Sequence, residues 1–172
     1  MTGRSERTLL GLWAHPDDEA YLSAGLMATA VRAGRRVVVV TATYGEAGTS
    51  DPARWPPARL APLRRREMAA SMAAVGVSEH HWLGYPDGGC AAIDPARADA
   101  DLAAVIRGVR PDAVVTFGPE GMTGHPDHRT LSGWVTTAWR RHCPTAQLWH
   151  ATQLASFHER WGELNELSLI HI

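Results

Sequence analysis

A chain of 172 residues, of which 45% are apolar and 20% charged, predicts one globular domain with a buried core. Its formal net charge of −1 argues against nucleic-acid binding, which depends on clustered positive charge. No segment reaches the ~18 consecutive apolar residues of a membrane span. The two cysteines, Cys90 and Cys143, match neither a metal motif nor a disulfide framework. We therefore expect a cytoplasmic protein without nucleic-acid or membrane partners.

The first part of the chain alternates strand-like and helix-like segments. Leu9–Ala14 is a short apolar run that predicts a buried strand. The next segment has helical spacing and ends near Gly34, a residue type that favours a helix C-terminus. Val37–Thr41 is continuously β-branched, which is typical of a central parallel strand covered on both faces. We expect one face of the helix between these strands to present Leu22, Leu26, Met27, Ala30 and Val31.

The middle of the chain continues this alternation. Tyr44–Pro62 is rich in glycine and proline and predicts a long loop, and long loops in compact domains are usually functional. Leu63–Val75 has helical spacing, and His81–Leu83 predicts a third short strand that ends in a turn over Tyr85–Gly89. An aspartate followed by a proline favours a helix start, which predicts a helix over Pro95–Val109.

The last part of the chain predicts two further strands. Ala113–Phe117 forms the fourth and ends in a loop over Gly118–His128 that is rich in glycine and histidine. Arg129–Arg141 predicts a helix and Leu148–Thr152 a fifth strand, while no element is predicted from Ala155 onward. The alternation predicts an α/β fold, a Rossmann-like three-layer sandwich with a mostly parallel sheet in the order 3-2-1-4-5.

Two chemically dense segments leave the carboxyl ends of strands one and four, which are neighbours in that order. His15, Asp17 and Asp18 follow the first strand, and His125 and His128 follow the fourth. A catalytic metal ion takes three ligands of the histidine and carboxylate type and keeps one position open for water. His15, Asp18 and either histidine of the second loop would meet this requirement.

Each segment alone has a simpler interpretation. Asp17, Asp18 and Glu19 could cap the following helix and complement its dipole, and histidines in a polar loop are often solvated. The occurrence of both segments at the ends of adjacent strands favours a functional site instead. The sequence contains no Gly-x-Ser-x-Gly motif of serine hydrolases, no P-loop and no dinucleotide-binding motif.

Ala14–Glu19, with the sequence AHPDDE, and His125–His128, with the sequence HPDH, together resemble the PIG-L/LmbE-like family of zinc-dependent N-acetylglucosaminyl de-N-acetylases. The resemblance covers roughly Leu9–Ala138. It implies a hydrolase that removes the acetyl group from an N-acetylated amino sugar or its conjugate, which would be the small-molecule partner. Zn²⁺ would be the cofactor, and Fe²⁺ is compatible with the same ligands.

The resemblance implies a role for each residue of the two motifs. His15, Asp18 and His128 would hold the metal ion. Asp17 would act as the general base and later as the general acid. His125 would polarise the acetyl carbonyl and stabilise the oxyanion.

Other residues have less direct roles. Asp127 is counted with the catalytic residues because it would orient one imidazole, and a solvated loop aspartate is the alternative. Glu46, Arg64 and Asp87 match family positions associated with substrate contact and would reach sugar hydroxyls. Alternatively, Arg64 could be a solvated residue at the start of a helix, and Asp87 could be present because aspartate favours a turn. Glu19 is expected to be a first-turn helix residue without direct chemistry.

Two features depart from the family pattern. Mycothiol-pathway deacetylases carry a tyrosine where this chain has Thr123. Family members also continue into a C-terminal segment that helps to shape the substrate pocket, which the single domain expected over residues 1–172 would lack. We therefore keep two alternative functions, an amidase acting on a larger acyl group or a thiol conjugate, and a non-catalytic sugar-binding module. The sequence is compatible with a homo-oligomer and leaves the oligomeric state open.

Overall fold

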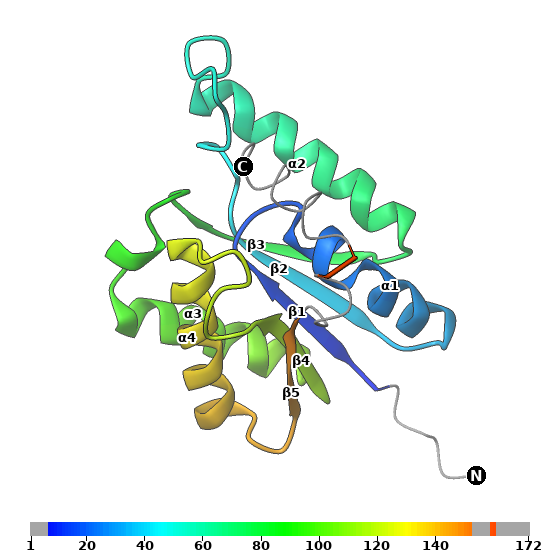
Figure 1. Ribbon diagram of the computed structural model, residues 1–172. Coiled ribbons are helices and arrows are strands. Elements are labelled where there is room, and N and C mark those ends of the chain that lie inside the picture. The colour runs from blue at the N-terminus through cyan, green and yellow to red at the C-terminus, as the bar shows by residue number, and fades with distance from the viewer. Residues whose placement is uncertain (1–6, 153–158, 161–172) are drawn as a thin grey trace, which may run out of the picture.

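A computed structural model describes residues 7–152 and 159–160 of the chain (Figure 1). Strands and helices alternate along these residues. The strands are β1 (Leu9–Trp13), β2 (Val37–Thr43), β3 (Glu79–Tyr85), β4 (Ala113–Phe117) and β5 (Gln147–Ala151). The helices are α1 (Asp18–Arg32), α2 (Pro57–Ala74), α3 (Pro95–Val109) and α4 (Pro126–His142), with a short 3₁₀ helix over Cys90–Ala92.

The strands form one parallel sheet in the order β3-β2-β1-β4-β5, which confirms the predicted α/β fold and strand order. Leu9 of β1 lies opposite Val37 of β2 on one side and Ala113 of β4 on the other. Figure 1 shows α1 and α2 on one face of the sheet and α3 and α4 on the other. The winding therefore reverses between β1 and β4, which is where such sheets bind ligands.

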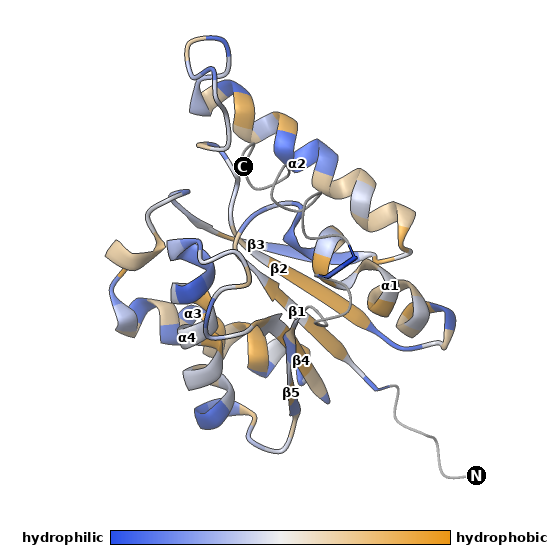
Figure 2. Ribbon diagram, viewed as in Figure 1, coloured by the Kyte–Doolittle hydropathy of each residue, from blue (hydrophilic) through white to orange (hydrophobic). Residues whose placement is uncertain are grey.

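The core lies along the three central strands. Every residue of β1, β2 and β4 is buried, because helices on both faces leave no wet side for alternating polar residues. Figure 2 shows these strands as the hydrophobic centre of the molecule. Trp13 and Phe117 pack edge to face at the carboxyl ends of β1 and β4, with ring centroids 5.1 Å apart.

Two helices begin earlier than the sequence predicted. Helix α2 starts at Pro57, so the predicted loop over Tyr44–Pro62 is too long. A proline is favoured at the first helical position, and Pro62 near the start of the helix removes only one hydrogen bond, which the buried apolar face of α2 outweighs. Helix α4 starts at Pro126 for the same reason, not at Arg129.

Local assignments differ in three further places. Leu26 was predicted to share one face of α1 with Met27 and Ala30, but it is 38% exposed whereas those two residues are buried. Strand β3 extends beyond the predicted His81–Leu83 through pairing with β2. Strand β5 begins at Gln147, one position before the prediction. The segment from Ala155 onward lies outside the described residues, apart from 159–160.

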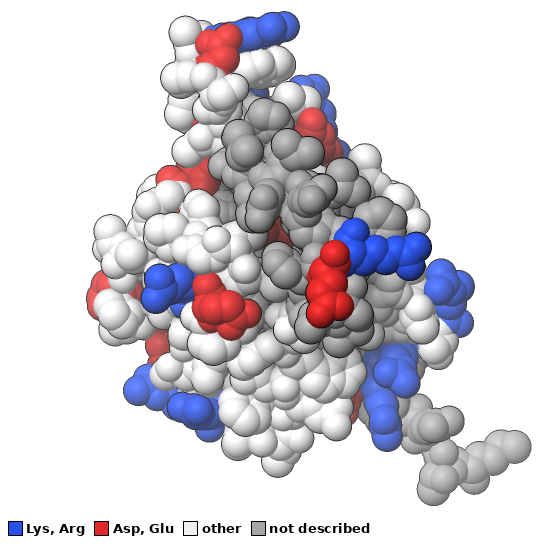
Figure 3. Space-filling model, viewed as in Figure 1, with Lys and Arg blue, Asp and Glu red and all other residues white. Residues whose placement is uncertain are grey.

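Charged side chains of both signs are intermixed on the face seen in Figure 3. They are not gathered into one basic or acidic patch on that face. Among the helices of the described residues, none combines the length and the apolar character that crossing a membrane requires.

Candidate metal and active site

The carboxyl ends of β1 and β4 bring together the two motifs that the sequence singled out. His15 follows β1, and His128 lies in the first turn of α4, which follows the loop after β4. Because β1 and β4 pair directly, ring nitrogens that are 113 positions apart in the sequence lie 3.0 Å apart. The site therefore depends on the reversal of winding between these two strands.

Three predicted ligands converge at this point. His15 Nδ1 lies 3.0 Å from His128 Nε2. Asp18 places one carboxylate oxygen 3.6 Å from His15 Nδ1 and the other 3.3 Å from His128 Nε2. Ligands about 2 Å from a shared ion in tetrahedral geometry lie roughly 3.3 Å from one another. The donor types of His15, Asp18 and His128 thus suit a divalent cation, and each pair of these side chains approaches to within 3.6 Å.

Hydrogen bonds fix the orientation of these ligands. His128 Nδ1 lies 3.0 Å from the carbonyl oxygen of Gly121, so it carries the proton and leaves Nε2 with a free lone pair. The His128 ring also stacks on Phe117, with centroids 4.1 Å apart. The backbone N–H of His15 donates to Asp18 Oδ2 at 2.7 Å. Such contacts hold metal ligands in place before an ion binds.

The other nitrogen of His15 faces two carboxylates. His15 Nε2 lies 3.1 Å from Asp87 Oδ1 and 3.3 Å from Asp127 Oδ2. Asp127 is fully buried and also accepts hydrogen bonds from the backbone N–H groups of Gly88, at 2.8 Å, and Cys90, at 3.1 Å. Asp127 therefore lies beside the His15 ring, where the prediction that it orients an imidazole requires it to be.

Among the described residues, two groups of three side chains offer ligand atoms that all lie within 4.8 Å of one another. They are His15, His125 and His128, and His15, Asp87 and Asp127. The second group is less suited to a metal, because Asp87 and Asp127 already accept backbone hydrogen bonds and contact the nitrogen of His15 that faces away from His128. A metal-bound histidine usually donates its remaining N–H to a carboxylate, which is the arrangement seen here.

The electrostatics of the cluster favour a positive charge. Burial alone would lower the pKa of His15, but the hydrogen bonds with Asp127 and Asp87 raise it to about 10. Burial raises the pKa of Asp18 to about 7. Burial, together with the charge on His15, lowers the pKa of His128 to about 4. The surrounding carboxylates thus stabilise one cation at this point.

Asp17 lies beside the ligand cluster without joining it. Its Oδ2 accepts a hydrogen bond from Arg64 Nη2 at 2.6 Å, and the same guanidinium also contacts the carbonyl oxygen of Pro16. Burial raises the pKa of Asp17, and the charge of Arg64 opposes this shift. The structure therefore places Arg64, which was predicted to contact substrate, against the predicted general base.

His125 presents one free nitrogen at the edge of the cluster. Its Nδ1 accepts a hydrogen bond from the backbone N–H of Asp127 at 3.1 Å and caps α4. This bond places the proton of a neutral ring on Nε2, which is left as a donor. The ring lies edge-on to His15, with centroids 4.7 Å apart. Burial, followed by the charge of His15, lowers the pKa of His125.

Glu46 and Asp87 connect two loops at the rim of the site. Glu46 Oε1 accepts from the backbone N–H of Asp87 at 3.0 Å. Asp87 Oδ2 in turn accepts from the backbone N–H of Ala47 at 2.8 Å. The predicted contacts of Glu46, Arg64 and Asp87 with sugar hydroxyls stay predictions.

The sequence interpretation missed two contributions to the site. Glu19 was expected to be a first-turn helix residue without direct chemistry, and it does lie in the first turn of α1, but its side chain is also fully buried beside Asp17. Ser71 of α2, to which the sequence assigned nothing, donates to Glu19. A back-bonding glutamate in the first turn of a helix is a known capping pattern, so Glu19 carried a detectable signal, whereas Ser71 carried none.

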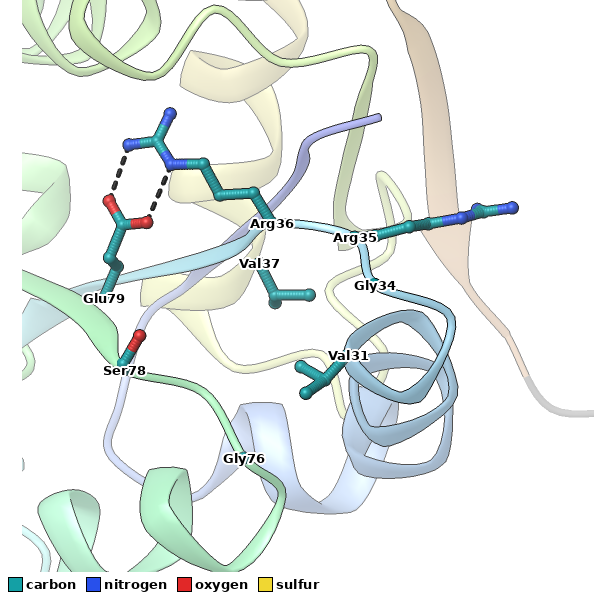
Figure 4. A pocket seen from close by; sticks show the side chains of 8 residues that line it. All are labelled: Val31, Gly34, Arg35, Arg36, Val37, Gly76, Ser78 and Glu79. Carbon is teal, nitrogen blue, oxygen red and sulfur yellow. Dashed lines mark hydrogen bonds and ion pairs between the residues drawn. The ribbon is translucent and has the colours of Figure 1, made fainter. Parts of the chain in front are cut away.

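A cavity of about 360 Å³ lies away from this cluster, at the amino ends of β2 and β3 (Figure 4). Two of the charged side chains that line it form an ion pair with each other. Arg36 donates two hydrogen bonds to Glu79, at 2.7 and 2.6 Å. Figure 4 shows Arg35 extending away from this ion pair. Within the described part of the chain, no histidine lines this cavity, and its one carboxylate, Glu79, is paired with Arg36.

Residues 10–139 match the model of the PIG-L family, described as GlcNAc-PI de-N-acetylase. The chain belongs to the PIG-L family. The matched region includes all the site residues named above, from His15 to His128.

Two curated PIG-L relatives are named 1D-myo-inositol 2-acetamido-2-deoxy-alpha-D-glucopyranoside deacetylase. The protein from Kineococcus radiotolerans is 39% identical over 150 residues, which cover 71% of this chain and 42% of the relative. The protein from Mycobacterium sp. (strain KMS) is 40% identical over 152 residues, which cover 76% of this chain and 49% of the relative. The chain thus spans about half the length of these relatives.

A solved structure of N,N'-diacetylchitobiose deacetylase from Pyrococcus horikoshii has a similar fold. The TM-score is 0.72 at 27% identity, and the match covers 79% of this chain and 50% of that protein. A structure of the teicoplanin-pathway deacetylase matches with a TM-score of 0.69 at 21% identity, covering 87% of this chain and 69% of the other, and shows the shared fold.

Proposed function

We propose that this chain is a metal-dependent deacetylase that hydrolyses the N-acetyl amide of an N-acetylglucosamine-type sugar or conjugate. The observation that carries the proposal is the convergence of His15, Asp18 and His128 beside Asp17. Membership of the PIG-L family supports the reaction class, and the names of the relatives support the sugar. Water and the amide would give a free amine and acetate.

His15, Asp18 and His128 would hold the cation. Two imidazoles and a carboxylate suit Zn²⁺, and Fe²⁺ accepts the same set. A divalent cation bound there supplies Lewis acidity that polarises a carbonyl and makes a nearby water more acidic. We propose zinc as the native metal and the cytoplasm as the compartment.

We propose that Asp17 moves the proton of the reaction. It follows the ligand His15 by two positions but contacts Arg64 instead of the cluster, so its carboxylate can accept a proton from the attacking water. The same group would later donate that proton to the departing amine. The guanidinium of Arg64 favours the ionised carboxylate that the first step requires.

We propose that His125 stabilises the oxyanion. Because the backbone N–H of Asp127 occupies Nδ1, the free Nε2–H can donate to the carbonyl oxygen as its negative charge develops. Asp127 would act through His15, which it orients. Glu46, Arg64 and Asp87 would bind sugar hydroxyls at the rim, within a single deacetylase domain.

The test is a deacetylation assay with the zinc-loaded protein on N-acetylglucosaminyl-inositol, N,N'-diacetylchitobiose and N-acetylglucosamine, measuring acetate and free amine. We expect Asp17→Asn to lower kcat by about 10²- to 10⁴-fold, because it removes the general base, and to leave the bound metal in place. Asp94→Asn is the matched control, because asparagine also caps a helix well.

Other outcomes would distinguish the alternatives. Wild-type turnover in Asp17→Asn would contradict the proposed mechanism. Sugar binding without acetate release would indicate a non-catalytic sugar-binding module. Cleavage confined to a longer acyl group or a thiol conjugate would indicate the broader amidase activity.

A further inference from the structure

Glu19 is a buried carboxylate with two specific partners. Its side chain has no exposure to solvent. Oε2 accepts a hydrogen bond from the backbone N–H of Asp17 at 3.1 Å, and Oε1 accepts one from Ser71 Oγ at 3.1 Å. A carboxylate is costly to bury and needs such partners. A first-turn glutamate can cap its helix while exposed to solvent, so capping alone does not account for the burial of Glu19.

The backbone of Asp17 is in an unfavourable conformation. Its φ is 150° and its ψ is −25°, a region that non-glycine residues rarely adopt. Asp17 is also the N-cap of α1, where an aspartate normally turns its side chain toward the N–H groups of its own helix. Here the side chain makes no capping bond and contacts Arg64 instead. Other groups must therefore hold this backbone in place.

Helix α2 supplies two of the contacts that hold this turn. Arg64 contacts the carboxylate of Asp17 and the carbonyl of Pro16. Ser71 lies two turns further along α2, on the same face, and contacts Glu19. Glu19 connects Ser71 to the backbone N–H of Asp17, so the turn is held from its side chain by Arg64 and from its backbone by Glu19.

We propose that Glu19, held by Ser71, is a positioning residue that fixes the backbone of Asp17 and so directs its carboxylate toward the reacting atoms. This inference rests on the proposed function, in which Asp17 moves the proton. The hydrogen bonds of the Glu19 carboxylate go to the backbone N–H of Asp17 and to Ser71, and none goes to a side chain of the ligand cluster. The hydrogen bond therefore acts on the backbone of Asp17, and Glu19→Gln separates it from the charge of Glu19, which also acts on Asp18.

The test compares Glu19→Ala with Glu19→Gln. Glutamine can accept from the N–H of Asp17 with its carbonyl and donate its amide to Ser71 Oγ, so it keeps both contacts without the charge. We expect Glu19→Ala to lower kcat about 100-fold, as small misplacements of catalytic groups do, with KM and bound zinc unchanged. Glu19→Gln should keep most of the wild-type kcat.

Two serine variants complete the comparison. Ser71→Ala removes the hydroxyl that holds Glu19 and should lower kcat to a smaller extent, and it is informative even if Glu19→Ala does not fold. Ser23→Ala is the matched control, because the hydroxyl of Ser23 is also buried but donates to the backbone carbonyl of Glu19, not to its carboxylate. Ser23→Ala should keep the wild-type kcat.

A second measurement does not depend on turnover. Hydrogen exchange of the Asp17 amide, followed by NMR, should be slow in the wild type and in Glu19→Gln and faster in Glu19→Ala. If the wild type shows no deacetylase activity, the proposed function fails while amide exchange still tests the positioning. Unchanged kcat and exchange in Glu19→Ala, or a Glu19→Gln variant as inactive as Glu19→Ala, would overturn the inference.

Discussion

At the scale of single residues, His80 shows how burial alters a titratable group outside the site. Its Nε2 lies 3.0 Å from Thr41 Oγ1, and its ring packs edge-on against Trp82 with centroids 4.5 Å apart. Burial, reinforced by the charges of His81 and Arg65, lowers its pKa to about 4. His80 is therefore neutral in the folded protein at pH values where an unfolded histidine, with a pKa near 6.5, is protonated.

We predict that His80 makes folding sensitive to mild acid. Because its folded pKa lies below the unfolded value, its contribution is complete above about pH 6.5 and is lost as the pH falls to about 4. The loss should be on the order of 1 kcal/mol, since the side chain is only partly buried. Urea unfolding of His80→Gln from pH 7 to pH 4 should show a flatter pH dependence than the wild type. Exposed His150→Gln is the control, and an equally steep curve for His80→Gln would count against the prediction.

At the scale of elements, strand β1 sets the position of the site through close packing. A Cβ atom on Gly11 would lie 2.9 Å from Trp13 Nε1 and 3.7 Å from Val39 Cγ2. Trp13 is itself fully buried against Phe117 and directly precedes the segment that carries His15. Glycine at position 11 therefore allows the tryptophan to pack where the two strands end.

We predict opposite effects for two glycine-to-alanine substitutions. Gly11→Ala should lower the free energy of unfolding by about 1–3 kcal/mol, because the methyl group displaces Trp13 in a closely packed core. Gly25→Ala, on an exposed face of α1 where the new Cβ meets no atom within 4 Å, should raise it by about 0.5–1 kcal/mol through helix propensity. Urea denaturation measures both. Equal stability of the two variants would show that position 11 has room for a side chain.

At the scale of the whole molecule, the candidate site connects the two halves of the sheet. His15 and Asp18 come from the β1-α1 half, and His128 comes from α4 beyond β4. An ion held by all three would therefore oppose separation of the halves. A ligand that binds only the folded state stabilises it by about 2.7 kcal/mol at 100 times its Kd.

We predict that zinc raises the Tm of the wild-type protein and that a chelator reverses the increase. His128→Ala removes one of the converging nitrogens and should abolish the zinc-dependent increase. The exposed His150→Ala variant should respond like the wild type. Differential scanning calorimetry with and without zinc measures the shift, and an undiminished shift in His128→Ala would exclude this residue as a ligand.

Much of the fold could be predicted from local patterns. Continuous apolar runs predicted the central strands because both faces of a parallel sheet are covered. The predicted bounds of β4 and α3 agree with the structure. The starts of α2 and α4 were misplaced because glycine and proline locally indicate loops. A proline can also occupy the first position of a helix whose apolar face packs against the core.

The sequence by itself determined which candidate metal-binding and acid–base side chains the protein carries, because the AHPDDE and HPDH motifs contain them. Only the tertiary structure decided how those groups act on one another. The contacts of Asp17 with Arg64 and of Glu19 with Ser71 join residues about fifty positions apart, and periodicity has no signal at that separation. They exist because the sheet places α2 beside the first turn of α1, which no local pattern specifies.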